Sequence, residues 1–277
     1  MIDNRGFLYT GNVMASGYNE KDQIVLVGGA YNAPISQDNM VFIIVDEEGE
    51  RTRLGSGGGI QAGHIVHTFG CGHANLPIEE MYPRIGGFVG FHPICELPLT
   101  FFTHIVGEMG INQFLWLERA EGYGKAIMSS WNFHKDDIMW IFSHTGINAV
   151  NIDVALEAKR LGMKVVVFGS ASETGAKVPR HSCGKNLFQI ADYVVDSCCP
   201  LQDASVKMKK EFDKIGPLST VAFVTLVWMT ICTVAEILEE RGVKLYIHPS
   251  HNVPGYTTAA ERLDACIKKY KELVAGV

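Results

Sequence analysis

From residue 63 onward, short apolar runs alternate with stretches whose apolar residues recur at helical spacing. Five apolar runs predict strands, at 64–69, 88–94, 136–144, 163–170 and 191–197. Three stretches between them predict helices, at Leu76–Ile85, Leu115–Ser130 and Asn148–Leu161. Strands that alternate with helices form βαβ units, in which the strands run parallel and helices cover both faces of the sheet. The pattern therefore predicts an α/β fold, a three-layer α-β-α sandwich.

Residues 1–60 follow a different pattern, with strand-like runs at 23–29 and 40–45 and a turn-rich stretch at 47–54. The glycine-rich segment 55–63 is typical of a flexible joint. We therefore expect two parts, a small β-rich N-terminal extension (1–60) and a main domain (61–277).

The segment Thr220–Leu238 is apolar enough for a membrane span, yet it contains several threonines and ends among Glu236, Glu239 and Glu240. A buried central helix, or a helix at a subunit interface, explains it better than a membrane span does.

Charge and cysteine content narrow the function classes. A formal net charge of −6 argues against a broad nucleic-acid-binding surface, which needs a basic face. The first residues lack the basic start and apolar core of a signal peptide. Seven cysteines, an odd number without framework spacing, indicate reduced thiols. These features predict a cytoplasmic protein with neither nucleic acid nor membrane as a partner.

Two glycine turns carry the candidate chemistry. In HTFGCGHAN (67–75), glycines separate a predicted strand from a helix that starts with proline, and Gly70, Cys71, Gly72 and Asn75 are the candidate ligand contacts. Glycine permits φ > 0 and a close approach of the backbone to a ligand, while a helix start offers free N–H groups. Such a turn can bind an anion such as phosphate, although a tight turn without a ligand has the same pattern.

The second turn, SHTGINAV, follows the strand at 136–144. Its candidate ligand contacts are Ser143, His144, Thr145, Gly146 and Asn148, of which Asn148 is also expected to cap the next helix. Hydroxyl groups and free backbone N–H groups bind phosphate together.

With HTFGCGHAN, SHTGINAV, VPRHSCGKNLFQIADYVVD (178–196) and GPLSTV (216–221), the chain resembles the sugar isomerase (SIS) domain family, in its group of stand-alone bacterial phosphosugar-binding proteins. The resemblance implies a flavodoxin-like, five-stranded parallel sheet, homodimers or homotetramers with active sites shared between subunits, and a sugar phosphate held by Ser143 and Thr145. Family members usually carry a hydroxyl residue where Cys71 and Ala74 stand here, so the anionic group could be a phosphate or a sulfonate.

Aldose–ketose isomerisation through a cis-enediol needs a base that moves a proton between C1 and C2. The resemblance implies a helix-borne glutamate for this role, for which Glu121 comes first and Glu118 second. A solvated acidic face, with Glu121 paired to Lys125, is the alternative.

Ring opening needs a second acid/base group. His181 is the first candidate, because it lies in a loop and histidine as a residue type can exchange protons near neutral pH, and His73 is the second. Candidate sugar contacts nearby are Ser182 and Lys185, and His248 and His251 are candidates for closing a neighbouring subunit's pocket.

No metal or other cofactor is predicted, because the chain has no HxH or HExxH motif. His64 and His67 are expected to point to opposite faces of a strand. Some sugar isomerases of this fold use zinc, so a site centred on His73 stays open.

The sequence thus predicts an aldose–ketose isomerase for an anionic sugar. Two alternatives are a sugar-phosphate sensor module and a deaminase or etherase of the same fold. A sensor that regulates transcription normally carries a helix-turn-helix, which residues 1–60 lack.

Overall fold

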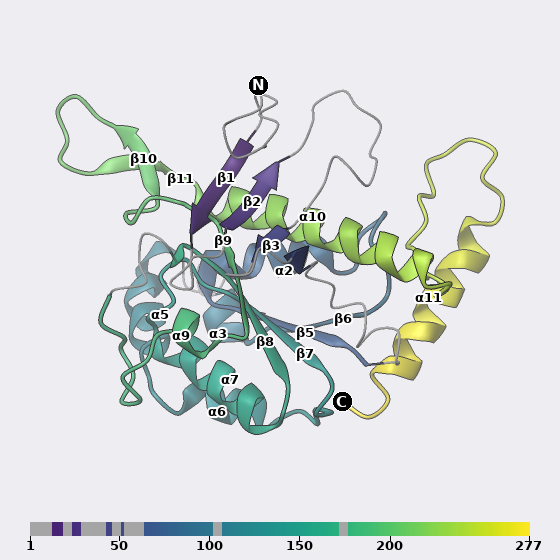
Figure 1. Ribbon diagram of the computed structural model, residues 1–277, viewed down its shortest axis with the longest axis horizontal. Helices are drawn as coiled ribbons and strands as arrows, with labels where there is room; N and C mark the ends of the chain where they lie inside the picture. Colours follow the sequence, from purple (N-terminus) through teal and green to yellow (C-terminus); the bar gives the residue numbers. More distant parts are fainter. Residues whose placement is uncertain are drawn as a thin grey trace.

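The computed structural model describes residues 64–101, 107–171 and 177–277, and the backbone of four strands ahead of them. Its centre is a parallel sheet of order β6-β5-β7-β8-β9 (Figure 1). The strands are β5 (Val66–Gly70), β6 (Phe91–Ile94), β7 (Ile138–Phe142), β8 (Lys164–Gly169) and β9 (Tyr193–Asp196). The five-stranded parallel sheet expected from the sequence is therefore confirmed. Four strands fall within their predicted runs, and β5 ends one residue beyond the run predicted at 64–69.

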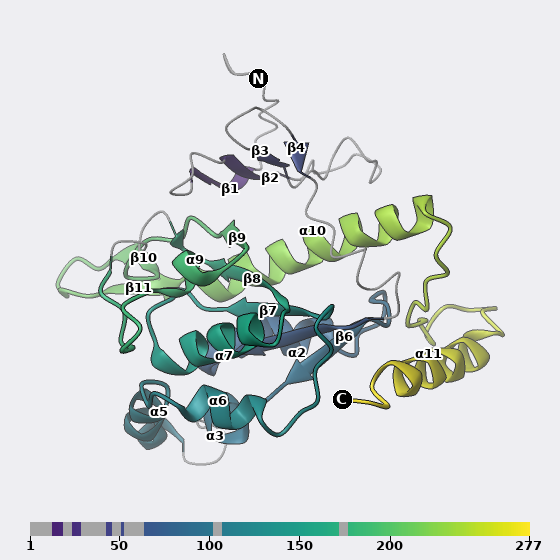
Figure 2. The same ribbon diagram turned by 60° about the horizontal axis from the view of Figure 1, so that its bottom comes forward.

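Helices cover both faces of this sheet (Figure 2). The helix α10 (Ser219–Glu240) packs on one face with α2 (Leu76–Met81). The other face carries α6 (Tyr123–Met128) and α7 (Ala149–Arg160). The remaining elements on the carboxyl side and flanks are η1 (Gly72–Asn75), α3 (Leu97–Thr100), η2 (Glu108–Gly110), α5 (Ile111–Leu117), α9 (Leu187–Ile190) and α11 (Ala259–Leu273).

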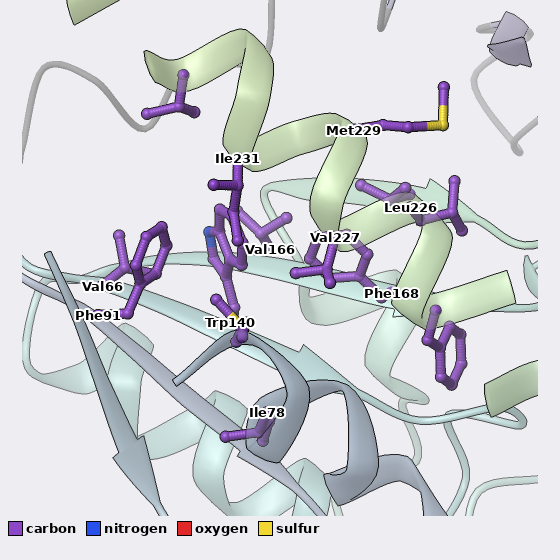
Figure 3. Close-up of a cluster of buried hydrophobic side chains, with 14 of the residues drawn as sticks. Val66, Ile78, Phe91, Trp140, Val166, Phe168, Leu226, Val227, Met229 and Ile231 are labelled. Atoms are coloured by element: carbon purple, nitrogen blue, oxygen red, sulfur yellow. The ribbon is translucent and has the colours of Figure 1, made fainter. Parts of the chain in front are cut away.

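The core between α10 and the sheet explains the apolar segment at 220–238. Within the described part of the chain, α10 is the one helix long and apolar enough to cross a membrane. Its Leu226 and Val227 are nevertheless buried against Trp140 and Phe168 of the sheet (Figure 3). This packing is that of the buried central helix expected from the sequence.

The N-terminal strands form a separate antiparallel sheet of order β1-β2-β3-β4. Their bounds are β1 (Val13–Tyr18), β2 (Ile24–Gly28), β3 (Ile43–Val45) and β4 (Arg51–Thr52). Strands β2 and β3 coincide with the two predicted runs, whereas β1 was not predicted and β4 falls in the predicted turn. The predicted joint at 55–63 lies outside the described residues, and the domain boundary there stays a prediction.

One predicted helix is wrong as a single element. The stretch Leu115–Ser130 is divided between α5 and α6, because Gly122 takes a left-handed φ of 91° between them. The N–H of Gly122 donates to the carboxylate of Asp153 at 2.7 Å, which fixes the break from the neighbouring helix α7. The pairing of β10 (Ala204–Lys207) with β11 (Lys214–Pro217) and the helix α11 were not predicted.

Candidate functional site

The sheet order places the first strand, β5, between the second and the third, so the chain leaves β5 in one direction and returns past it to β7. In open α/β sheets ligands bind at such a switch point, beyond the carboxyl ends of the strands. Both glycine turns lie there, one after β5 and the other after β7. The topology thus brings together two segments that lie far apart in the sequence.

The first turn requires its glycines for packing. A Cβ atom on Gly70 would lie 2.4 Å from the carbonyl oxygen of Ala74. Gly72 has φ +59° and faces the ring of Phe114, which would lie 2.7 Å from an added Cβ. Asn75 is buried and donates to Glu79 at 2.9 Å, so its amide belongs to the turn's internal bonds. These residues line the switch point, and their close packing against Ala74 and Phe114 leaves no room for side chains at Gly70 and Gly72.

The second turn is organised around the buried Ser143. The N–H of Gly146 donates to the Ser143 hydroxyl at 3.2 Å, and Gly146 has φ +65°. A Cβ atom on Gly146 would lie 2.7 Å from the Phe188 ring. Thr145 is half-buried beside it, and Nε2 of the half-buried His144 lies 3.4 Å from the carbonyl oxygen of Leu201.

Asn148 does not cap α7 with its side chain, contrary to the expectation, although it occupies the N-cap position. Its side-chain amide instead donates to Glu118 at 2.6 Å, and its amide oxygen accepts from Arg180 at 2.7 Å. A carboxylate within reach of the N–H₂ group competes successfully for the side chain. Asn148 therefore connects the second turn to Glu118.

A buried asparagine of α7, which the sequence analysis missed, bridges the two turns. The Cys71 thiol donates to Oδ1 of Asn151 at 3.5 Å, and Nδ2 of Asn151 donates to the Ser143 hydroxyl at 3.5 Å. Within the described residues Ser143 Oγ thus accepts two bonds, which leaves its own proton for a ligand. One feature of the sequence could have revealed Asn151: it is an amide residue within a helical stretch rich in alanine, valine and isoleucine.

Glu118 is the buried carboxylate of this site. Burial raises its pKa above the ordinary value, against the opposing influence of Arg119, Arg180 and the Asn148 hydrogen bond. Burial also raises the pKa of the Cys71 thiol, and the charge of Glu118 adds to that effect, which places the carboxylate near the first turn. Glu118 therefore interacts with both turns.

Glu121 lies outside this group and is exposed. It accepts hydrogen bonds from the hydroxyl and, at 2.8 Å, from the backbone N–H of Ser182. The side-chain hydrogen bond from Ser182 is the main reason why the pKa of Glu121 is lowered. Glu121 thus holds the loop around Ser182, and its partners are Ser182 and His181 rather than Lys125, the partner expected in the structural alternative.

His181 has both ring nitrogens engaged. Its Nδ1 accepts from the backbone N–H of Cys183 at 3.0 Å, so in the neutral ring the proton is on Nε2 and donates to Asp153 at 3.1 Å. Asp153 also accepts from Gly122 and from Gly124. The cluster ties the 177–186 loop to the break between α5 and α6.

The remaining candidates are dispersed. His73 is exposed at the first turn, and Lys185 is exposed in the loop after His181. The backbone of His248 bonds to Gly86 and Gly87, which precede β6 at the amino-terminal edge of the sheet, and His251 is exposed three residues later. Within one chain these two histidines lie away from the glycine turns, and their place in a neighbouring subunit's pocket stays a prediction.

A cavity of about 380 Å³ lies beside β6, lined by residues of β6, α3 and α6 together with neighbouring positions. Tyr123 donates to Glu96 at 2.5 Å in its wall, and burial together with that carboxylate raises the pKa of Tyr123 to about 12. Cys95, also in the wall, donates to Asn75 of the first turn at 3.7 Å. The cavity therefore adjoins the first turn, and its volume fits a small ligand.

Comparisons with known proteins identify the family. The SIS domain model matches residues 58–170, which include both glycine turns. A UPF0309 protein of Oceanobacillus iheyensis is 33% identical over 78% of this chain and 84% of its own length. One from Thermoanaerobacter pseudethanolicus is 34% identical over 76% and 82%.

The chain belongs to the SIS domain family. Among solved structures, a phosphoheptose isomerase from Francisella tularensis is 13% identical over 65% of this chain and 81% of its own, with a TM-score of 0.39. A protein of E. coli CFT073, solved as a complex, is 15% identical over 65% and 72%, with a TM-score of 0.34. Both likenesses are too weak to carry an argument about the substrate of this SIS domain.

Proposed function

We propose that this SIS domain is an aldose–ketose isomerase that acts on a phosphorylated or sulfonated sugar through a cis-enediol. The observation that carries the proposal is the position of Glu118, a buried carboxylate with a raised pKa between two turns that can bind an anion and a sugar. A carboxylate of raised pKa is a stronger base when it is ionised.

In this proposal the second turn holds the anionic group. The Ser143 hydroxyl and the Thr145 hydroxyl supply donors, and the start of the twelve-residue helix α7 supplies the positive end of a helix dipole. The sugar carbons then extend toward the first turn and the cavity beside β6.

Glu118 removes the proton from C2 and returns it to C1, and the hydroxyl proton of O2 passes to O1, so that the aldehyde becomes a ketone. The Asn148 amide, already polarised by Arg180, is placed to donate to the enediolate oxygens. We assign ring opening to His73, because it is exposed at the first turn, whereas both nitrogens of His181 are engaged. His181 then acts as a positioning residue.

The test is exchange of the sugar's C2 proton with deuterium oxide, followed by NMR over phosphorylated and sulfonated hexoses and pentoses. We expect wild type to exchange the proton and form the isomer of at least one sugar. Glu118→Gln should lower the rate by about 10²–10⁴-fold, the usual contribution of a general base. Glu121→Gln, the matched control three residues on, should lower it by no more than about tenfold, because it acts through the loop.

A Glu118→Gln protein that keeps more than a third of the wild-type rate would contradict the assignment. Tight binding of a sugar phosphate by wild type, without any exchange, would contradict the isomerase proposal and favour the sensor module. Comparison of phosphate and sulfonate esters of the same sugar identifies the anion.

A further inference from the structure

Three side chains that could bind a metal ion meet at the amino-terminal edge of the sheet. His64 directly precedes β5, while His134 and Asp136 lie in the turn that precedes β7. One ligand atom from each lies within 4.8 Å of the other two. The rings of His64 and His134 are stacked, with centroids 4.3 Å apart. This cluster is separate from the proposed sugar site, which lies at the carboxyl-terminal edge.

A buried carboxylate stands directly behind the cluster. Asp137 Oδ1 lies 3.6 Å from Nδ1 of His64, and its other oxygen lies 3.1 Å from Nε2 of His67. The backbone N–H groups of Ile65 and His134 donate to the same carboxylate at 3.1 and 2.8 Å. In metal sites, a ligating histidine commonly donates its second ring nitrogen to such a fixed carboxylate. The 3.6 Å separation is longer than a hydrogen bond, so Nδ1 of His64 has to move closer to Asp137 when an ion binds Nε2.

We propose that His64, His134 and Asp136 bind a divalent transition metal ion of the zinc class. Two imidazoles and one carboxylate are a donor set that such ions accept, with a further position left for water. Ligand atoms around zinc lie about 3.4 Å apart, as bonds of about 2.1 Å in a tetrahedron require, so the side chains need to close by up to about 1.4 Å. The stacked rings of His64 and His134 also need to turn, so that both lone pairs point at the ion. His134 and Asp136 are exposed, and the adjustment breaks only the stacking on His64 and the hydrogen bond from the Asp136 N–H to Nδ1 of His134 at 3.2 Å.

The ion would join the segment that enters β5 to the turn that enters β7, two strands that pair in the centre of the sheet. Because the site exists only when the sheet is formed, metal binding stabilises the folded protein. The sequence analysis missed the cluster for two reasons. Its ligands lie far apart in the sequence, and His64 precedes the strand, so the opposite-face rule for His64 and His67 does not hold. Both histidines face Asp137.

The experiment is a calorimetric titration of the full-length, EDTA-treated protein with Zn²⁺, without any sugar. We expect one high-affinity site per chain. His134→Ala and Asp136→Ala should each weaken zinc binding at least tenfold, and His251→Ala, an exposed histidine outside the cluster, should leave it unchanged. Both test positions are exposed, so the variants should fold. Zn²⁺ should also raise the Tm of wild type and of His251→Ala, and should raise it less in His134→Ala and Asp136→Ala.

Substitution with Co²⁺ gives a second readout, because the visible absorption of bound Co²⁺ reports nitrogen and oxygen ligands. We expect these bands in wild type and in His251→Ala, and their loss in His134→Ala. Wild-type protein that binds no Zn²⁺, or binding that survives unchanged in both cluster variants, would overturn the proposal. Loss of binding in His73→Ala but not in His134→Ala would overturn it too, and would move the metal to the first glycine turn.

Discussion

Two carboxylates, one at each edge of the same sheet, are buried to a similar extent, yet their pKa values are shifted in opposite directions. The side chain of Glu118, at the carboxyl-terminal edge, is 9% exposed, and that of Asp137, at the amino-terminal edge, is 5% exposed. Burial raises the pKa of Glu118. Burial acts in the same direction on Asp137, but hydrogen bonds from His67, His134 and Ile65 outweigh it, and its pKa is lowered.

The difference between their pKa shifts shows that burial alone does not make a carboxylate reactive. Three donors, one of them the ring of His67, stabilise the ionised form of Asp137, which makes it a good structural anion and a poor base. Glu118 accepts one short hydrogen bond, from a neutral amide, and keeps lone pairs for a substrate proton. We therefore assign structure to the amino-terminal edge and sugar chemistry to the carboxyl-terminal edge.

The largest expected effect comes from removing the charge at the amino-terminal edge. Asp137→Asn should lower the free energy of unfolding by about 3–5 kcal/mol, because three buried hydrogen bonds, from His67, Ile65 and His134, lose their charged acceptor. Chemical denaturation of EDTA-treated protein measures this, so that any bound metal does not contribute. Activity per folded molecule should stay within a factor of about three.

Asp136→Asn is the matched control next in the chain. Asp136 is exposed, and surface substitutions usually change stability by less than about 0.5 kcal/mol. Equal losses in the two variants would show that Asp137 has no special role, and the contrast between the two edges would fail.

A smaller effect on the free energy of unfolding should follow from lowering the pH, through a histidine at the same edge. Burial, followed by the nearby His67, lowers the pKa of His92 from 6.5 to about 4. The folded protein therefore binds fewer protons than the unfolded chain between pH 4 and 6.5, and the free energy of unfolding should fall as the pH drops through that window. One such group accounts for at most about 3 kcal/mol.

His92→Gln should flatten this slope in denaturation curves measured from pH 4 to pH 7. His251→Gln, at an exposed histidine, should leave the slope as in wild type. The pKa of Asp137 lies below its usual value, so its own contribution is lost only at still lower pH. A slope that is the same in His92→Gln as in wild type would refute the assignment of the pH dependence to His92.

The fold was largely readable from the sequence because its signals are local. Apolar runs such as Met163–Ser170 contain the parallel strands, and glycine turns mark the ends of β5 and β7. The break at Gly122 was not readable, because the Asp153 carboxylate that fixes it comes from another helix. The hairpin β10–β11 was missed because its exposed strands lack an apolar run.

The site was readable only in part, since its key contacts join distant segments. Both glycine turns were predicted, and the structure places them at one sheet edge. The ranking of Glu121 above Glu118 followed the family resemblance, whereas burial and the bond to Asn148 are known only from the structure. Asn151 and Asp137 were missed for the same reason. Neither belongs to a motif, and each has a partner more than 70 residues away, Cys71 for Asn151 and Ile65 for Asp137.

The smallest expected effect is the difference in stability between alanine substitutions at two glycines, one at each edge of the sheet. Gly146, in the second turn, and Gly86, before β6, both have left-handed φ values, +65° and +88°. An alanine costs about 1–2 kcal/mol at either position for the backbone alone. At Gly146 the new Cβ also lies 2.7 Å from the Phe188 ring, whereas at Gly86 it meets nothing within 4 Å among the described residues.

Gly146→Ala should therefore be less stable than Gly86→Ala by a further 1–3 kcal/mol or so, the usual cost of overpacking. It should also weaken sugar-phosphate binding, because Ser143 and the amides that surround the anion belong to the same turn. Gly86→Ala should bind as wild type does, since Gly86 bonds to the backbone of His248, away from both glycine turns. Equal binding by the two variants, measured at a temperature where both are folded, would remove the second turn from the anion site and leave the first turn and the adjoining cavity to hold the sugar.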